Sequence, residues 1–169
     1  MNEIIVIGIG QELRGDDGAG LAVVCRWQRQ YPQTSSRVRV ELYPLPGLDL
    51  INVWDGARVA IIVDAVHCDA RPGSLYKLNP DDLASFGADA ASAHGWGLAE
   101  TLKLAAELAL PGEVPEIRTL AISGSNFKLG TGLSPAVKRA LPAAVAHLQE
   151  MVNGVLDQDA VLESSPINF

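Results

Sequence analysis

Two kinds of hydrophobic pattern alternate along the chain. Short apolar runs, most of them rich in valine and isoleucine, are typical of strands that are buried on both faces of a parallel sheet. Longer segments with apolar residues three and four positions apart are typical of helices that cover such a sheet. The strand-like runs are residues 3–9, 37–43, 58–64, 73–78 and 116–123. The helical segments are residues 18–31, 48–54, 80–86, 94–110 and 134–152.

The order of these elements predicts an α/β fold. We expect a three-layer sandwich, with a largely parallel, open, twisted sheet of about five strands and helices on both faces. The length of 169 residues suits one domain, and 48% hydrophobic residues supply its core. We place this single domain at residues 1–152. Residues 153–169 show no clear periodicity, so we expect a loose C-terminal tail there.

Charge and cysteine content narrow the class of protein. Thirteen Lys and Arg residues against twenty Asp and Glu give a formal net charge of -7, which argues against binding to nucleic acid or to an anionic membrane. Cys25 and Cys68 have no paired spacing, which excludes a disulfide framework and suits a reducing cytosol. No apolar run reaches the ~18 residues that a membrane span needs. We therefore expect a cytoplasmic protein.

The loop after the first strand reads GIGQELRGDDGAG, from Gly8 to Gly20. A glycine loop in this place suggests a dinucleotide site, but the third glycine of that motif would fall on Leu13, and Asp16 and Asp17 would repel a pyrophosphate. Acids are also favoured at helix N-termini by capping and by the helix dipole. Two adjacent acids exceed what one cap needs, so we predict that at least one of them is functional.

Two further side chains are candidates for the same site. Asp64 ends an apolar run, where a carboxylate costs desolvation free energy unless it accepts hydrogen bonds or binds a ligand. His94 precedes a long helix and, taken alone, is more typical of a surface residue or a cap. Functional residues of open α/β sheets gather at the carboxyl ends of the strands, so Asp17, Asp64 and His94 are expected to meet there. Two carboxylates and an imidazole leave coordination positions open on a metal, as substrate binding requires.

Four segments, in this order, span nearly the whole predicted domain. They are GIGQELRGDDGAG, VDAVHCDARPG, SAHGWGLAETL and FKLGTGLSPAVKRAL. With these segments the chain resembles the nickel-iron hydrogenase maturation proteases, the endopeptidases that process hydrogenase large subunits. The chain departs from the family pattern at Gln11, where asparagine is commoner, and at Tyr43–Gly47, which lacks an acid that some members carry.

The resemblance implies an endopeptidase that removes the C-terminal extension of a nickel-iron hydrogenase large-subunit precursor after nickel insertion. It implies that Asp17, Asp64 and His94 take the places of the family's metal ligands, and that Asp16 matches the neighbouring acid. Nickel would arrive with the precursor, so no permanently bound metal is expected, and we expect a monomer. The nickel could act as a Lewis acid or serve only as a recognition mark, and Asp16 or Asp17 could act as a base.

Two other classes of protein stay open. A receiver domain also carries paired acids after its first strand and an aspartate that accepts phosphate, but the acids here lie several residues beyond the strand. We also find no convincing lysine at the end of the last strand. A non-catalytic hydrogenase assembly chaperone of the same fold would bind the precursor without cutting it. The chain has neither a G-x-S-x-G nor an H-E-x-x-H motif, so no resident nucleophile or catalytic zinc is indicated.

Overall fold

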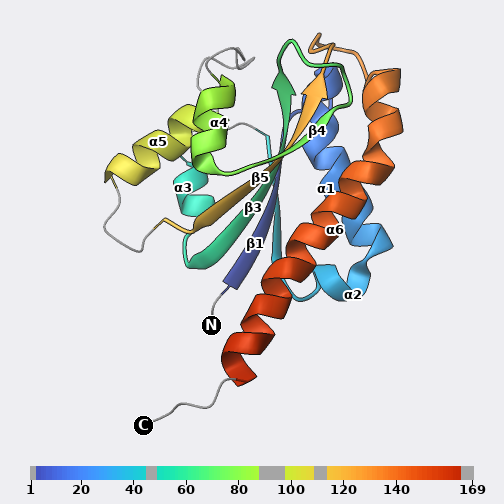
Figure 1. Cartoon of the computed structure of the whole chain (residues 1–169). Coiled ribbons are helices and arrows are strands. Elements are labelled where there is room, and N and C mark those ends of the chain that lie inside the picture. Colours follow the sequence, from blue (N-terminus) through green and yellow to red (C-terminus); the bar gives the residue numbers. More distant parts are fainter. Residues whose placement is uncertain (1–2, 45–48, 88–97, 109–113, 165–169) are drawn as a thin grey trace.

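The computed structural model describes residues 3–44, 49–87, 98–108 and 114–164 (Figure 1). Its strands are β1 (Glu3–Ile9), β2 (Arg39–Tyr43), β3 (Ala57–His67), β4 (Leu75–Leu78) and β5 (Glu116–Gly124). Its helices are α1 (Ala19–Gln30), α2 (Pro32–Ser35), α3 (Leu50–Val53), α4 (Pro80–Gly87), α5 (Leu98–Leu108) and α6 (Pro135–Ser164). A short 3₁₀ turn, η1 (Gly15–Gly18), leads into α1. Within these described ranges, no helix is long and apolar enough to span a membrane.

The strands form one open sheet in the order β2-β1-β3-β5-β4. The pairs β1–β2, β1–β3 and β3–β5 are parallel, and only the edge strand β4 runs antiparallel to its neighbour β5. Helices α3, α4 and α5 cover one face of the sheet, and α1 and α6 cover the other (Figure 1). The predicted fold class is confirmed. The carboxyl ends of the parallel strands lie together at the upper edge in this view.

The core explains why the central strands read as continuous apolar runs. In β1, Ile4 and Val6 pack with the α1 and α6 side, whereas Ile5 and Ile7 pack with the α3 and α5 side. Because successive residues of a strand point to opposite faces, a strand that is covered on both faces must be apolar at every position. All four side chains are buried.

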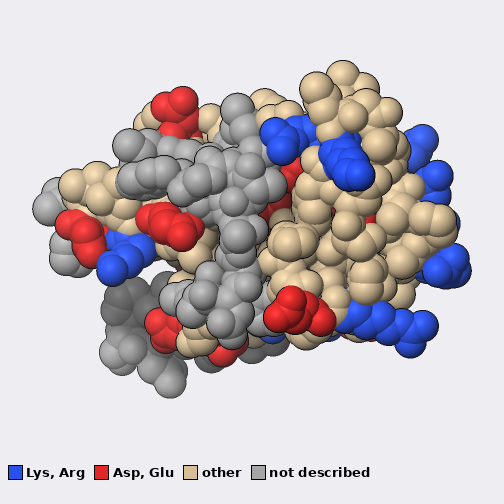
Figure 2. Space-filling view, turned by 90° about the horizontal axis from the view of Figure 1, so that it is seen from above, with Lys and Arg blue, Asp and Glu red and all other residues tan. Residues whose placement is uncertain are grey.

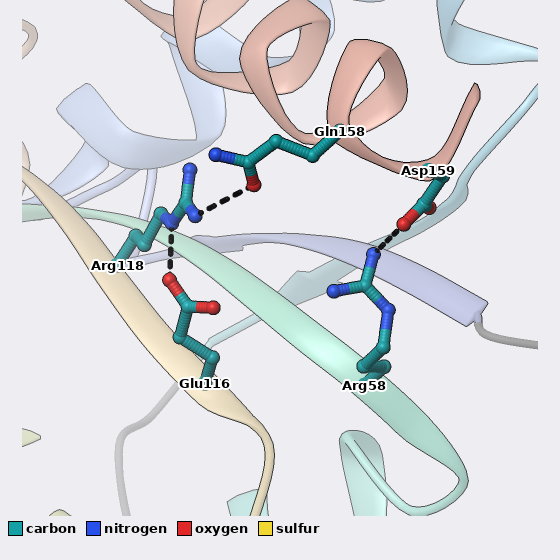
Figure 3. Close-up of polar contacts among 5 residues, drawn as sticks. All are labelled: Arg58, Glu116, Arg118, Gln158 and Asp159. Atoms are coloured by element: carbon teal, nitrogen blue, oxygen red, sulfur yellow. Dashed lines mark hydrogen bonds and ion pairs between the residues drawn. The ribbon is translucent and has the colours of Figure 1, made fainter. Parts of the chain in front are cut away.

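The C-terminal helix extends beyond the predicted domain boundary. We expected a loose tail from residue 153, but α6 continues to Ser164, and Val155 and Leu156 belong to the buried core. Near this end of α6, Asp159 pairs with Arg58 of β3, and Gln158 Oε1 accepts a hydrogen bond of 3.4 Å from Arg118 of β5 (Figure 3). The expectation was wrong because burial outweighs the low helix propensity of Asn153-Gly154, about 1 kcal/mol for the glycine.

Candidate functional site

The loop between β1 and α1 folds back on itself and fixes Asp17. Gly10 has φ 138°, and a Cβ atom there would lie 1.8 Å from the Asp17 carbonyl oxygen, so only glycine fits. The backbone N–H of Gln11 donates a hydrogen bond of 3.0 Å to Asp17 Oδ2. Asp17 is 4% exposed. The sequence thus places a nearly buried carboxylate at the carboxyl end of the first strand.

Asp16 is fully buried and holds three chain segments together. Its Oδ2 accepts hydrogen bonds from the backbone N–H groups of Ser125 (2.8 Å) and Asn126 (3.1 Å), and its Oδ1 accepts one from that of Ser134 (2.6 Å). Burial would raise the pKa of Asp16, but these backbone hydrogen bonds outweigh burial and lower it. Asp16 is therefore an ionised carboxylate that joins η1 to the β5–α6 connection.

The sequence suggested that Asp64 ends its strand, but the structure shows that it does not. β3 continues to His67, and Asp64 lies opposite Ala121 of β5 in the parallel register. The backbone N–H of Ala65 donates to Asp64 Oδ1 at 2.8 Å. The residue keeps some accessible surface, yet burial of its carboxyl group is the main cause that raises the pKa of Asp64 to about 8. The charge of Asp17 is the second cause, and the Ala65 hydrogen bond opposes both.

The influence of Asp17 on the pKa of Asp64 shows that the two carboxyl groups lie within electrostatic reach of each other. A glycine makes this approach possible. A Cβ atom on Gly20 would lie 2.3 Å from both the Ile9 and the Val63 carbonyl oxygens, so the first turn of α1 sits directly on the ends of β1 and β3. The preceding turn, η1, is thereby brought beside Asp64, and η1 contacts β3.

The third predicted ligand, His94, lies outside the described residues. Among the residues that are described, no group of three or more His, Cys, Asp and Glu side chains is placed to hold a metal ion. The structure thus brings Asp17 and Asp64 together, and the metal-binding roles of Asp17, Asp64 and His94 stay predictions. Figure 2 looks down on this edge, where Lys and Arg side chains lie mostly over the half occupied by α1 and α6.

The residues that anchor Asp16 were not predicted from the sequence. Ser134 Oγ accepts a hydrogen bond of 3.3 Å from Val137 N–H at the start of α6, and the Ser134 N–H donates to Asp16. Ser125 and Asn126 follow β5 without any motif that marks them. Nothing in the local sequence relates these residues to an acid more than a hundred positions earlier.

Comparison with known proteins decides the family. Residues 45–151 match the family model described as Hydrogenase maturation protease (HycI). The chain belongs to the hydrogenase maturation protease family. It is 33% identical to the hydrogenase expression/formation protein HupD of Thiocapsa roseopersicina, over 85% of this chain and 64% of that protein. It is 32% identical to the protein FrxA of Pyrococcus furiosus, over 82% of this chain and 96% of that protein.

A solved hydrogenase maturation protease has the same fold. The [NiFe] hydrogenase maturation protease HybD from Thermococcus kodakarensis superposes with a TM-score of 0.68 and 27% identity, covering 89% of this chain and 99% of that one. The family assignment and the α/β fold are therefore confirmed, and the receiver-domain alternative finds no support in these matches. The family match includes Asp64 and the position of His94, and the loop with Asp16 and Asp17 precedes it.

Proposed function

We propose that this hydrogenase maturation protease is an endopeptidase that removes the C-terminal extension of a nickel-iron hydrogenase large-subunit precursor after nickel insertion. The observation that carries the proposal is the pair of neighbouring carboxyl groups, Asp17 and Asp64, at the carboxyl edge of the sheet. Sites of open α/β proteins lie at this edge. Membership of a maturation protease family supplies the substrate class.

The carboxyl pair suits a divalent cation that arrives with the substrate. Burial and the neighbouring charge of Asp17 disfavour the ionised form of Asp64, whose pKa is raised to about 8. A cation between them would remove this repulsion. Nickel held by the precursor, with open coordination positions, would be bound by Asp17 and Asp64, and His94 is the proposed third ligand. The precursor without nickel would lack this means of docking.

The hydrogen bonds of Asp16, Asp17 and Asp64 suggest different roles for the three carboxylates. Both carboxylate oxygens of Asp16 accept backbone hydrogen bonds, which supports a positioning role for this residue. Asp17 and Asp64 are left to contact the substrate-borne metal. Nickel would polarise the scissile carbonyl group or a water molecule as a Lewis acid. A carboxylate oxygen of Asp17 that does not bind the metal would accept the proton of the attacking water.

The test is cleavage of a purified large-subunit precursor, followed by mass spectrometry of the intact protein. We expect loss of the C-terminal extension from nickel-loaded precursor and none from nickel-free precursor. Equal cleavage of both would contradict the role of nickel. Nickel-dependent binding of the precursor without any cleavage would identify a non-catalytic assembly chaperone instead.

A further inference from the structure

A pocket lies beside the start of α6. Its volume is about 340 Å³, and it lies between the loop that joins β3 to β4 and the first turns of α6. Its lining residues are Arg71, Pro72, Gly73, Ser74, Ala136, Arg139 and Ala140. The small Ala136 and Ala140 side chains leave the space, and an arginine stands on each of the two elements that form it.

The loop side of this pocket is held in place by backbone contacts. Gly73 has φ 85°, and a Cβ atom there would lie 2.8 Å from the Ala136 carbonyl oxygen, so the turn packs closely on α6. The Gly73 N–H donates to the Ser123 carbonyl at 2.7 Å, and the Ser123 N–H donates to the Ser74 carbonyl at 2.9 Å. The loop is thus clamped to the end of β5 as well. A pocket formed by clamped segments needs little ordering when a ligand binds.

The two arginines of the pocket differ from the three arginines that lie in the strands of the sheet. Arg39, Arg58 and Arg118 each form an ion pair with a carboxylate. Within the described residues, neither Arg71 nor Arg139 forms a hydrogen bond or an ion pair, and no acidic residue lines the pocket. Two unpaired guanidinium groups in one hollow, on a protein of net charge -7, indicate a site for an anion.

The pocket is connected to the carboxyl pair through both of its walls. β3 carries Asp64 and ends at His67, four residues before Arg71. On the other wall, Ser134 at the start of α6 donates its N–H to Asp16, beside Asp17, and Arg139 follows one turn later in the same helix. A peptide that docks at Asp17 and Asp64 can therefore reach the arginines with a neighbouring segment.

We propose that Arg71 and Arg139 bind a carboxylate group of the peptide substrate. The group is either an acidic side chain or the C-terminal carboxylate of the extension. Arginine suits this ligand because its planar guanidinium donates two parallel hydrogen bonds to a carboxylate. The acidic pair repels the same group, so the two sites together fix the direction in which the peptide lies. This inference rests on the proposed proteolysis, because it takes the ligand to be the extension of the precursor.

Direct binding of synthetic extension peptides tests the pocket without relying on cleavage. Four peptides are compared, in which the C-terminus is free or amidated and the acidic side chains are kept or replaced by the corresponding amides. Fluorescence anisotropy gives the Kd of each peptide. We expect Arg71→Gln and Arg139→Gln each to weaken binding by about tenfold. Lys138→Gln, the same loss of charge on the neighbouring exposed residue outside the pocket, should leave Kd unchanged. If the wild-type protein and the arginine variants bind a peptide with an amidated C-terminus equally well, the C-terminal carboxylate is the group that is bound. If they bind a peptide with side-chain amides equally well, an acidic side chain is the group that is bound.

A charge exchange separates recognition from a folding defect. Arg139→Glu should bind the acidic peptide poorly and regain affinity for a peptide in which the recognised acidic residue, or an added C-terminal residue, is lysine. Binding of the fully amidated peptide by the wild-type protein as tightly as the acidic one overturns the proposal. So does tight binding of inorganic phosphate that leaves the Kd of the peptide unchanged.

Cleavage of the nickel-loaded precursor distinguishes this inference from the proposed function. We expect Arg139→Gln to raise KM and to leave kcat unchanged, since the arginine acts in docking. If both arginine variants cleave the precursor with an unchanged KM, the carboxylate-binding role of the pocket is contradicted and the proposed proteolysis is not. If no precursor is cut by any variant or by the wild-type protein, while peptide binding still depends on Arg71 and Arg139, the proteolysis proposal fails and the carboxylate site stands.

Discussion

The two ends of the sheet treat charge in opposite ways. At the end where β3 and β5 begin, the arginines of these two strands are paired with acids, Arg58 with Asp159 and Arg118 with Glu116 (Figure 3). At the carboxyl edge, burial and the charge of Asp17 raise the pKa of Asp64, and two arginines of a nearby pocket form no ion pair among the described residues. Buried or unpaired charged groups lower the stability of the folded state, so the rest of the fold must outweigh this cost. Such groups are concentrated where proteins bind ligands. The comparison separates an end where charges are paired from the edge where we propose that the substrate binds.

The largest effect on activity is expected from Asp64→Asn. Asparagine keeps the size of the side chain and removes the charge that would bind nickel, so cleavage of nickel-loaded precursor should fall by about 100-fold or more. The melting temperature should stay the same or rise, because the repulsion with Asp17 is removed. Mass spectrometry of the product and a thermal melt measure the two quantities. Cleavage at the wild-type rate by a folded Asp64→Asn protein would remove the carboxyl pair from the mechanism.

The largest effect on stability at this edge is expected from Asp16→Asn. One of the carboxylate oxygens becomes an amide NH₂ group that faces backbone donors, so the free energy of unfolding should fall by about 3 kcal/mol. Urea denaturation followed by circular dichroism measures it. Asp69→Asn is the matched control, because Asp69 is exposed, and its effect should stay within about 0.5 kcal/mol. A fall no larger than that of the control would mean that Asp16 does not anchor the loop.

Asp64 should also make the metal-free protein less stable as the pH rises. Its pKa is 3.8 when unfolded and about 8 when folded, so the folded state binds the proton more tightly between these values. The free energy of unfolding contributed by Asp64 therefore decreases as pH increases from about 4 to about 8, and levels off above that range. Unfolding measured across this range should show a smaller decline in Asp64→Asn than in the wild-type protein. In Asp17→Asn, the free energy of unfolding should stop decreasing at a lower pH, because the charge that helps to raise the pKa of Asp64 is gone. If the free energy of unfolding changes with pH in the same way in the wild-type protein and in Asp64→Asn, the raised pKa of Asp64 is contradicted.

The smallest effect is expected at the opposite end of the sheet. Arg58→Met removes a partly exposed ion pair with Asp159, whose side chain is 22% exposed, and such pairs contribute less than about 1 kcal/mol. Cleavage of the precursor should be unchanged, because this pair lies far from the carboxyl edge of the strands. A double-mutant cycle with Asp159→Asn gives the coupling free energy. A loss of cleavage in Arg58→Met would erase the difference between the two ends.

Local pattern was sufficient for much of the fold. The apolar run 3–9 coincides with β1 (Glu3–Ile9), and the run 116–123 falls short of β5 (Glu116–Gly124) by one residue. These boundaries are marked in the sequence, because a glycine follows each apolar run. The end of β3 is not marked in this way. Three residues after Asp64 stay in the strand only because β5 offers partners as far as Gly124.

The site was predictable in part for the same reason. Asp17 and Asp64 could be placed at one edge from the order of strands and loops, since topology alone brings those ends together. The different environments of Asp16 and Asp17 could not be derived, because the donors that bind Asp16 come from residues 125–134, and only the folded chain brings them near. The two arginines of the pocket lie on separate elements and share no motif.

The length of α6 has a consequence for where the chain can be shortened. Its first turn touches the loop of Asp16 and lines the arginine pocket, while its later turns supply Val155 and Leu156 to the core and Asp159 to β3. A protein cut at Val152, the end of the helix predicted from the sequence, would expose core residues that those two side chains cover. The helix would then be attached to the sheet over a shorter length, and the position of its first turn would be less well fixed. Removal of the C-terminal turns of α6 would therefore weaken substrate binding at the pocket beside its first turn.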